Sequence, residues 1–138
     1  MMKAVMVPAV LAAGIACAPV GQADPGQAGL SQPFSQAGGP FVGDWGAHKE
    51  RVVVNSDGSG TETYSGGTMM FKLSSVQQPQ TAYGSVISGG NGPAGSFVTI
   101  QLVDGGNGML FSAGGGDTNF PFCKYVGGSP VNRADCGA

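Results

Sequence analysis

Short segments in which apolar and polar residues alternate recur through the second two-thirds of the chain, and glycine-rich turns separate them. Because successive side chains of a β-strand point to opposite faces, alternation with a period of two indicates half-buried strands. In the clearest segment, Val98, Ile100 and Leu102 share one face, and polar residues occupy the other. The pattern predicts strands at residues 49–55, 60–64, 68–77, 81–88, 96–103, 109–112 and 120–126.

The most specific local prediction is a β-hairpin that joins residues 49–55 to residues 60–64. Its first arm contains Val52-Val53-Val54, a run of β-branched residues that favours extended backbone. Between the arms, Asp57-Gly58 supplies the positive φ angle that a tight hairpin turn requires. We therefore expect these two strands to pair directly.

No segment beyond the first 23 residues shows the 3.6-residue period of an amphipathic helix. Six to eight short strands with turn signals between them are typical of an all-β fold, either a small antiparallel barrel or a sandwich. Pro121 interrupts the last predicted strand, and proline cannot donate a ladder hydrogen bond, so we expect that strand at a sheet edge. The predicted domain covers residues 41–138. Residues 24–40, rich in Gly, Gln, Pro, Ser and Ala, are predicted to form a flexible linker before it, with docking of Phe34 and Phe41 on the domain left open.

The N-terminus has the three parts of a secretory signal peptide, and we predict cleavage after Ala23. Lys3 supplies the positive charge, residues 4–18 form an uncharged apolar stretch, and small residues precede the cleavage site. A membrane anchor is the alternative, but a spanning helix needs about 20 apolar residues. Lipid attachment at Cys17 is a second alternative, although Gly14 stands where a lipobox has an aliphatic residue. The protein is therefore expected to be secreted.

Charged residues are few, and their balance restricts the expected partners. The chain carries six Lys and Arg against eight Asp and Glu, and loss of Lys3 with the signal peptide leaves a net charge of −3. Nucleic acids and anionic membrane surfaces need clustered basic residues, so we expect neither as a partner. The mature protein is expected to be a monomer that contacts an extracellular protein or a small ligand.

Two cysteines, Cys123 and Cys136, remain after the predicted cleavage. An even number of cysteines in an oxidising compartment indicates a disulfide. This bridge would close a loop of 14 residues and contribute about 3 kcal/mol in the chain-entropy model. A metal site is the alternative, but these two thiols lack two further ligands. We therefore predict a structural bridge that ties the C-terminal end to the domain.

The segment Gly43-Asp44-Trp45-Gly46-Ala47-His48 holds the only tryptophan and the only histidine of the chain. In a functional interpretation, His48 is a general base or a metal ligand, and Asp44 or Glu50 orients it. In a structural interpretation, Trp45 plugs one end of the β core and His48 bonds locally. A lone imidazole cannot build an ordinary zinc site, which needs three or four N or S ligands. We favour the structural interpretation and expect neither a metal nor a cofactor.

A longer pattern follows the same tryptophan: Trp45-x-x-His48-x-x-Arg51, an aliphatic run, then Asn55-x-Asp57-Gly58-x-Gly60. It resembles the first hairpin of small secreted actinobacterial proteins of unknown function, which often end near Cys-Gly, as this chain does. The resemblance covers residues 43–64 and the tail, and it departs in the middle, where those proteins often carry more cysteines. Gly43-x-Trp45 also resembles the Gly-x-Trp opening of lipocalin-like barrels, which implies a barrel with the tryptophan closing one end. Neither resemblance implies a ligand.

The absence of convergent ionisable residues in the sequence favours a non-enzymatic binding or interaction module with glycine-rich loops that present a contact surface. If the β body is a closed barrel, the alternative site is an apolar pocket inside it. The candidate binding residues are Trp45, Met69, Phe71, Val98, Ile100 and Phe111. Two other classes of function stay open: a small extracellular hydrolase that uses His48, and an envelope-associated structural protein.

Overall fold

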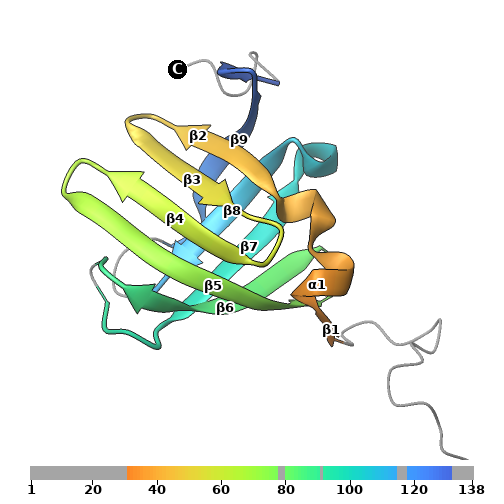
Figure 1. Ribbon diagram of the computed structural model, residues 1–138. Coiled ribbons are helices and arrows are strands. Elements are labelled where there is room, and N and C mark those ends of the chain that lie inside the picture. Colours follow the sequence, from red (N-terminus) through yellow and green to blue (C-terminus); the bar gives the residue numbers. More distant parts are fainter. Residues whose placement is uncertain (1–30, 78–79, 91, 115–117, 132–138) are drawn as a thin grey trace, which may run out of the picture.

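Strands make up most of the computed structural model, which describes residues 31–77, 80–90, 92–114 and 118–131 (Figure 1). The strands are β1 (Ser31–Pro33), β2 (Gly43–Ala47), β3 (Glu50–Val54), β4 (Ser59–Tyr64), β5 (Gly67–Gln77), β6 (Thr81–Ser88), β7 (Phe97–Val103), β8 (Gly108–Ala113), β9 (Phe120–Val126) and β10 (Ser129–Pro130). The helical elements are one turn of α-helix, α1 (Phe34–Ala37), and two 3₁₀ turns, η1 (Gly39–Phe41) and η2 (Asp104–Gly106).

Strands β2 to β9 form a closed antiparallel barrel in which each strand pairs with the next one along the chain. Pairing of β2 with β9 joins the two ends of this meander. Outside the ring, β1 pairs with β5 and β10 pairs with β9. The predicted all-β fold is therefore confirmed, and of the two architectures considered the chain adopts the small barrel.

The interior of the barrel is filled by the apolar residues of the alternating segments. Val98, Ile100 and Leu102 all point inward, as the pattern predicts. At the centre, the ring of Phe111 lies 5.7 Å from that of Phe71 and 5.8 Å from that of Phe122, measured between centroids. Tilted and edge-on contacts at these distances are favourable for aromatic pairs. The core is therefore packed mainly by direct contact between side chains from different strands.

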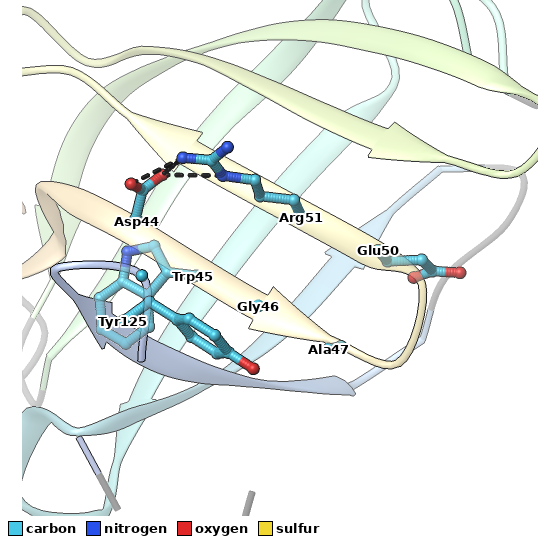
Figure 2. A pocket seen from close by; sticks show the side chains of 8 residues that line it. Asp44, Trp45, Gly46, Ala47, Glu50, Arg51 and Tyr125 are labelled. Carbon is cyan, nitrogen blue, oxygen red and sulfur yellow. Dashed lines mark hydrogen bonds and ion pairs between the residues drawn. The ribbon is translucent and has the colours of Figure 1, made fainter. Parts of the chain in front are cut away.

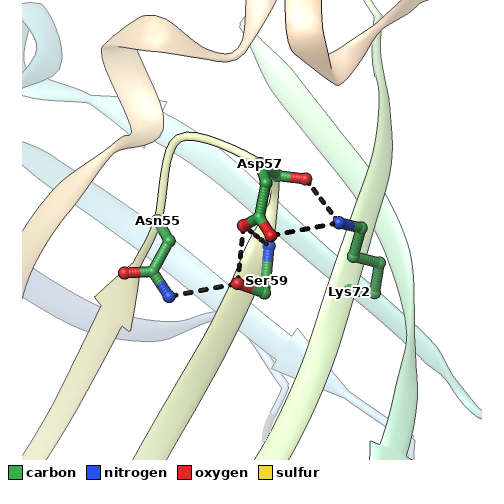
Figure 3. Close-up of polar contacts among 4 residues, drawn as sticks. All are labelled: Asn55, Asp57, Ser59 and Lys72. Atoms are coloured by element: carbon green, nitrogen blue, oxygen red, sulfur yellow. Dashed lines mark hydrogen bonds and ion pairs between the residues drawn. The ribbon is translucent and has the colours of Figure 1, made fainter.

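The predicted hairpin is confirmed as β3 and β4, and its turn is held by polar contacts (Figure 3). Gly58 has a φ of 88°, which is the left-handed conformation that the Asp-Gly pair was expected to supply. The Asp57 carboxylate accepts hydrogen bonds from the hydroxyl of Ser59 at 2.6 Å and from its backbone N–H at 2.9 Å. From β5, Lys72 donates to the backbone carbonyl of Asp57 at 2.6 Å. These bonds fix the turn against the neighbouring strand.

The same contacts predict how Asp57 titrates. The Ser59 hydroxyl, the Ser59 backbone N–H and the Lys72 ammonium all favour the charged carboxylate and hold its pKa below the usual value. A depressed pKa means that the turn gains stability above the unfolded-state pKa and loses it as the pH falls through the folded-state pKa. We expect Ser59→Ala to raise the pKa of Asp57 toward its usual value, as measured by an NMR pH titration. The distant substitution Ser112→Ala should leave that pKa unchanged, and equal shifts in both variants would contradict the assignment.

Residues 31–40, which we predicted to belong to the flexible linker, are part of the domain. They form β1, α1 and the start of η1, and the side chains of Phe34 and Phe41 are buried with ring centroids 6.2 Å apart. Low hydrophobicity and missing periodicity suggested a linker, but two aromatic side chains are enough to dock this segment over one end of the barrel. The remainder of the predicted linker lies outside the described residues.

Strand β9 does not lie at a sheet edge, contrary to the prediction from Pro121. It is flanked by β8 on one side and by β2 on the other. The proline is tolerated because β2 pairs only with residues 123–125 of β9, whereas Pro121 lies opposite Leu110 of β8. Pro121 therefore has a paired strand on one side only, which is the local environment that proline requires.

Several sequence predictions concern residues that the structure does not describe. The predicted signal peptide, Cys17 and Cys136 lie outside the described residues, so cleavage, lipid attachment and the Cys123–Cys136 bridge remain predictions. Cys123 itself lies half-buried in β9, opposite Gly46 of β2. Within the described ranges, no helix has the length and apolar character needed to span a bilayer.

Candidate functional site

A concavity of about 310 Å³ lies where β2, β3 and β9 meet (Figure 2). We call it the β2 groove. Its exposed lining residues alternate along the strands with buried residues, as Arg51 does with Val52. Because alternate side chains point to opposite faces of a strand, the groove lies on the outer face of the barrel. The residues that line the β2 groove are Asp44, Trp45, Gly46, Ala47, Glu50, Arg51, Tyr125 and Gly128.

One wall of the groove is an ion pair between Asp44 of β2 and Arg51 of β3. In the β2–β3 register Arg51 lies opposite Gly46, two residues from Asp44, so the two side chains are diagonal neighbours on one face. The Arg51 Nη2 lies 2.7 Å from each Asp44 carboxylate oxygen, and its Nε lies 3.0 Å from Oδ1. This bidentate geometry fixes both side chains, although the Arg51 side chain is 62% exposed and the Asp44 side chain 41%.

The opposite wall is the ring of Tyr125 from β9, which lies over Gly46. In the β2–β9 register Tyr125 faces Asp44, and Gly46 is its diagonal neighbour. A Cβ atom at position 46 would lie 2.5 Å from Cε1 and 2.9 Å from Cζ of the ring, closer than carbon atoms approach without displacement. Glycine is therefore needed at this position for the ring to rest on the strand, and Figure 2 shows the ring extending along β2 toward Ala47.

Beneath the groove, Trp45 anchors the central strand to the core. Its side chain is fully buried, and its indole N–H donates to the carbonyl oxygen of Phe41 at 2.9 Å. The Lys124 ammonium lies 5.7 Å from the centroid of the indole, within the range of a cation–π contact. Both contacts hold β2 against η1 and β9. Asp44 therefore enters the groove from a strand that the neighbouring Trp45 fixes in place.

The three catalytic candidates are not assembled around one another. His48 is exposed in the turn between β2 and β3 and is not among the residues that line the groove. Asp44 and Glu50 both line the groove, but Asp44 is bound to Arg51. Over the described ranges, no group of three His, Cys, Asp or Glu residues is arranged to hold a metal ion. The arrangement brings two of the three candidates to one concavity and leaves the imidazole outside it.

The six candidates for an internal apolar pocket all lie in the core. Each of them is at most 2% exposed, and Phe71 and Phe111 contact each other directly. Contacts among these side chains account for their burial, so they pack the barrel interior as core residues do. An internal binding site remains a hypothesis that these contacts do not require.

Five residues of the groove were not selected from the sequence: Gly46, Ala47, Arg51, Tyr125 and Gly128. Gly46 and Arg51 lie within the Trp45-x-x-His48-x-x-Arg51 pattern, which singled out this segment but predicted no role for either residue. For Tyr125 the sequence carries no such signal, because its place beside β2 depends on closure of the barrel.

Comparison with known proteins assigns no function to this arrangement. The chain matches no protein-family model, and it has no significant similarity to a curated protein or to a solved structure.

Proposed function

We propose that the mature chain is a secreted, non-enzymatic binding module and that the β2 groove is its contact site. One observation carries the proposal. The solvent-exposed bidentate ion pair Asp44–Arg51 forms one wall of the groove, the Tyr125 ring forms the opposite wall, and Gly46 between them has no side chain to fill the space. Such a site offers polar groups and an aromatic surface in a fixed arrangement. A site that is already ordered loses little conformational entropy when a ligand binds.

Binding is a better account of the groove than catalysis. General acid–base chemistry needs a base within hydrogen-bond reach of the group that it deprotonates. The imidazole of His48 points into solvent from a turn, and no described residue forms a hydrogen bond or ion pair with it. The Asp44 carboxylate is held by Arg51 in a bidentate ion pair. These contacts support recognition of a ligand.

The proposal is tested by mapping ligand contacts on the secreted protein with amide NMR spectra. We would titrate it with neutral sugars, amino acids, nucleosides and small carboxylic acids, each as a separate probe. At least one class is expected to shift the amide signals of Gly46, Arg51 and Gly128, and Tyr125→Ala should reduce these shifts. The matched control is Tyr83→Ala, which removes a half-buried tyrosine from β6. Shifts confined to core residues such as Phe71 and Phe111, or no shift with any probe, would refute the groove as the contact site.

Export and the disulfide are tested together by the intact mass of the secreted protein. We expect a mass that begins at Asp24 and is two hydrogens below that of the reduced chain, because cleavage follows Ala23 and Cys123 pairs with Cys136. Reduction should add the two hydrogens. An acylated Cys17, or a mass that does not change on reduction, would contradict the corresponding part of the proposal.

A further inference from the structure

The geometry points to a neutral saccharide ring as the ligand of the β2 groove, stacked on Tyr125 and hydrogen-bonded to the Asp44–Arg51 pair. This inference rests on the proposed function, since it names the class of molecule that the same site would bind. It follows from four properties of the groove: the charge balance of its walls, the hydrogen-bonding groups of the ion pair, the position of the aromatic ring and the size of the concavity.

The charge balance disfavours a strongly charged ligand. Asp44 and Arg51 neutralise each other through three short contacts. An anionic ligand would have to compete with Asp44 for the guanidinium. A cationic ligand would have to compete with Arg51 for Asp44. A neutral ligand faces neither penalty.

The ion pair still offers both donors and acceptors. These contacts engage Nε and Nη2 of Arg51, which leaves the two N–H groups of Nη1 outside the ion pair. Oδ1 of Asp44 accepts two of the hydrogen bonds, whereas Oδ2 accepts one and keeps a second lone pair. A sugar hydroxyl is a donor and an acceptor at once. Adjacent hydroxyl groups on one ring can therefore accept from Arg51 and donate to Asp44. Few other neutral small molecules carry such a pair at fixed spacing.

The aromatic wall suits the less polar face of a sugar ring. The Tyr125 ring rests on Gly46, so the position of one ring edge is fixed by the strand beneath it. The face of an aromatic ring is electron-rich, and the axial C–H groups of a pyranose carry partial positive charge. Stacking on Tyr125 places the ring hydroxyls beside Asp44, which lies opposite this tyrosine in the β2–β9 register.

The size of the concavity fits a single small ring. Its volume of about 310 Å³ lies at the lower end of small-ligand sites, which range from about 300 to 1,000 Å³. The groove is bounded by Gly128 at the β9–β10 turn. We therefore expect recognition of one residue of a glycan, with weak affinity for a free monosaccharide.

The experiment compares sugars that share a ring and differ in charge. The secreted protein is titrated, in amide NMR spectra, with methyl glucoside, methyl galactoside and methyl mannoside, and with the corresponding uronic acids and amino sugars. At least one neutral glycoside is expected to shift Gly46, Arg51 and Gly128 with higher affinity than its charged counterparts. Tyr125→Ala should lower that affinity about tenfold, whereas Tyr125→Phe should largely preserve it because the ring is retained.

Two further variants test whether binding requires the Tyr125 ring to lie in its present position on Gly46. Gly46→Ala keeps Tyr125 but displaces its ring, so affinity should fall nearly as far as in Tyr125→Ala. Tyr83→Ala, on β6, should change affinity less than about twofold. A thermal melt of each variant confirms that the barrel remains folded. Equal affinity in wild type and Gly46→Ala would refute the stacking.

The outcomes distinguish the ligand class from the site. If a charged sugar, an amino acid or a nucleoside shifts the groove amides and the neutral glycosides do not, the saccharide inference is wrong and the groove remains the binding site. If neutral glycosides shift only the outer face near Met70, Ile87 and Phe97, which are exposed on β5, β6 and β7, the groove is wrong as well. No shift with any probe refutes both proposals.

Discussion

Replacing Trp45 by alanine is expected to lower the free energy of unfolding by about 3–5 kcal/mol. The indole is fully buried, and its removal leaves a cavity that the closed barrel cannot collapse to fill. The loss also deprives the buried Phe41 carbonyl of the N–H that donates to it at 2.9 Å. Since small domains are stable by about 5–15 kcal/mol, this single change removes a large fraction of the total.

Urea unfolding followed by circular dichroism measures the effect as a lower midpoint concentration of urea. The dependence of the unfolding free energy on urea concentration should stay the same. Trp45→Phe serves as a milder variant, because it keeps an aromatic ring but leaves the Phe41 carbonyl without its partner. We expect it to cost about 1–3 kcal/mol, which remains measurable if Trp45→Ala does not fold. Val126→Ala, at a position 65% exposed, is the control and should lie within about 0.5 kcal/mol of wild type. A Trp45→Ala loss as small as that of the control would contradict the role of Trp45 in the core.

The strands were largely predictable because alternation is a local signal. The boundaries of β6 and β9 coincide with the predicted segments, and the β3–β4 hairpin follows from a β-branched run and an Asp-Gly turn. In β6 the fold buries Ala82 and Val86 and exposes Ile87, whereas in β5 and β7 the alternating apolar residues lie on the face that the fold buries. Local propensity and tertiary structure point to the same answer, so the sequence alone is sufficient there.

Strand β2 escaped prediction because its local signals are poor. It contains Gly43 and Gly46, which are disfavoured in strands, and Trp45 is its only large apolar side chain. The strand forms because β3 and β9 supply partners on both sides. Pairing of β2 with β9 joins segments that are distant in the chain, and no local pattern identifies such a partner. The same reason explains why a barrel and a sandwich could not be separated from the sequence.

The groove shows the same division between local and distant signals. Asp44 was selected as a carboxylate that could orient His48, but its partner Arg51 is identified by the β2–β3 register. The fit of Tyr125 on Gly46 depends on closure of the barrel, and a glycine in a sequence does not reveal whether a ring rests on it. Exposed polar residues that meet across strands are therefore the part of a site that sequence patterns miss first.

Closure also makes a strong prediction for Gly84 of β6. This glycine lies opposite Leu73, next to the irregularity in β5 between Leu73 and Ser75. A Cβ atom there would collide with the backbone carbonyl of Lys72 and lie 2.7 Å from the Leu73 Cα. Because the obstacle is backbone, the two strands themselves would have to separate.

Gly84→Ala is accordingly expected to cost about 1–3 kcal/mol or more, measured by urea unfolding as above. The matched control is Gly39→Ala, where the new methyl group meets no atom within 4 Å beyond its two chain neighbours, so the loss of stability should be clearly smaller than in Gly84→Ala. Amide hydrogen exchange provides a second measure, since faster exchange should concentrate in β5 and β6 and spare β3 and β4. Equal stability of the two alanine variants would mean that β5 and β6 are not packed as closely as the register requires. The different costs expected for the two Gly→Ala changes arise because, of the two glycines, only Gly84 faces another strand's backbone.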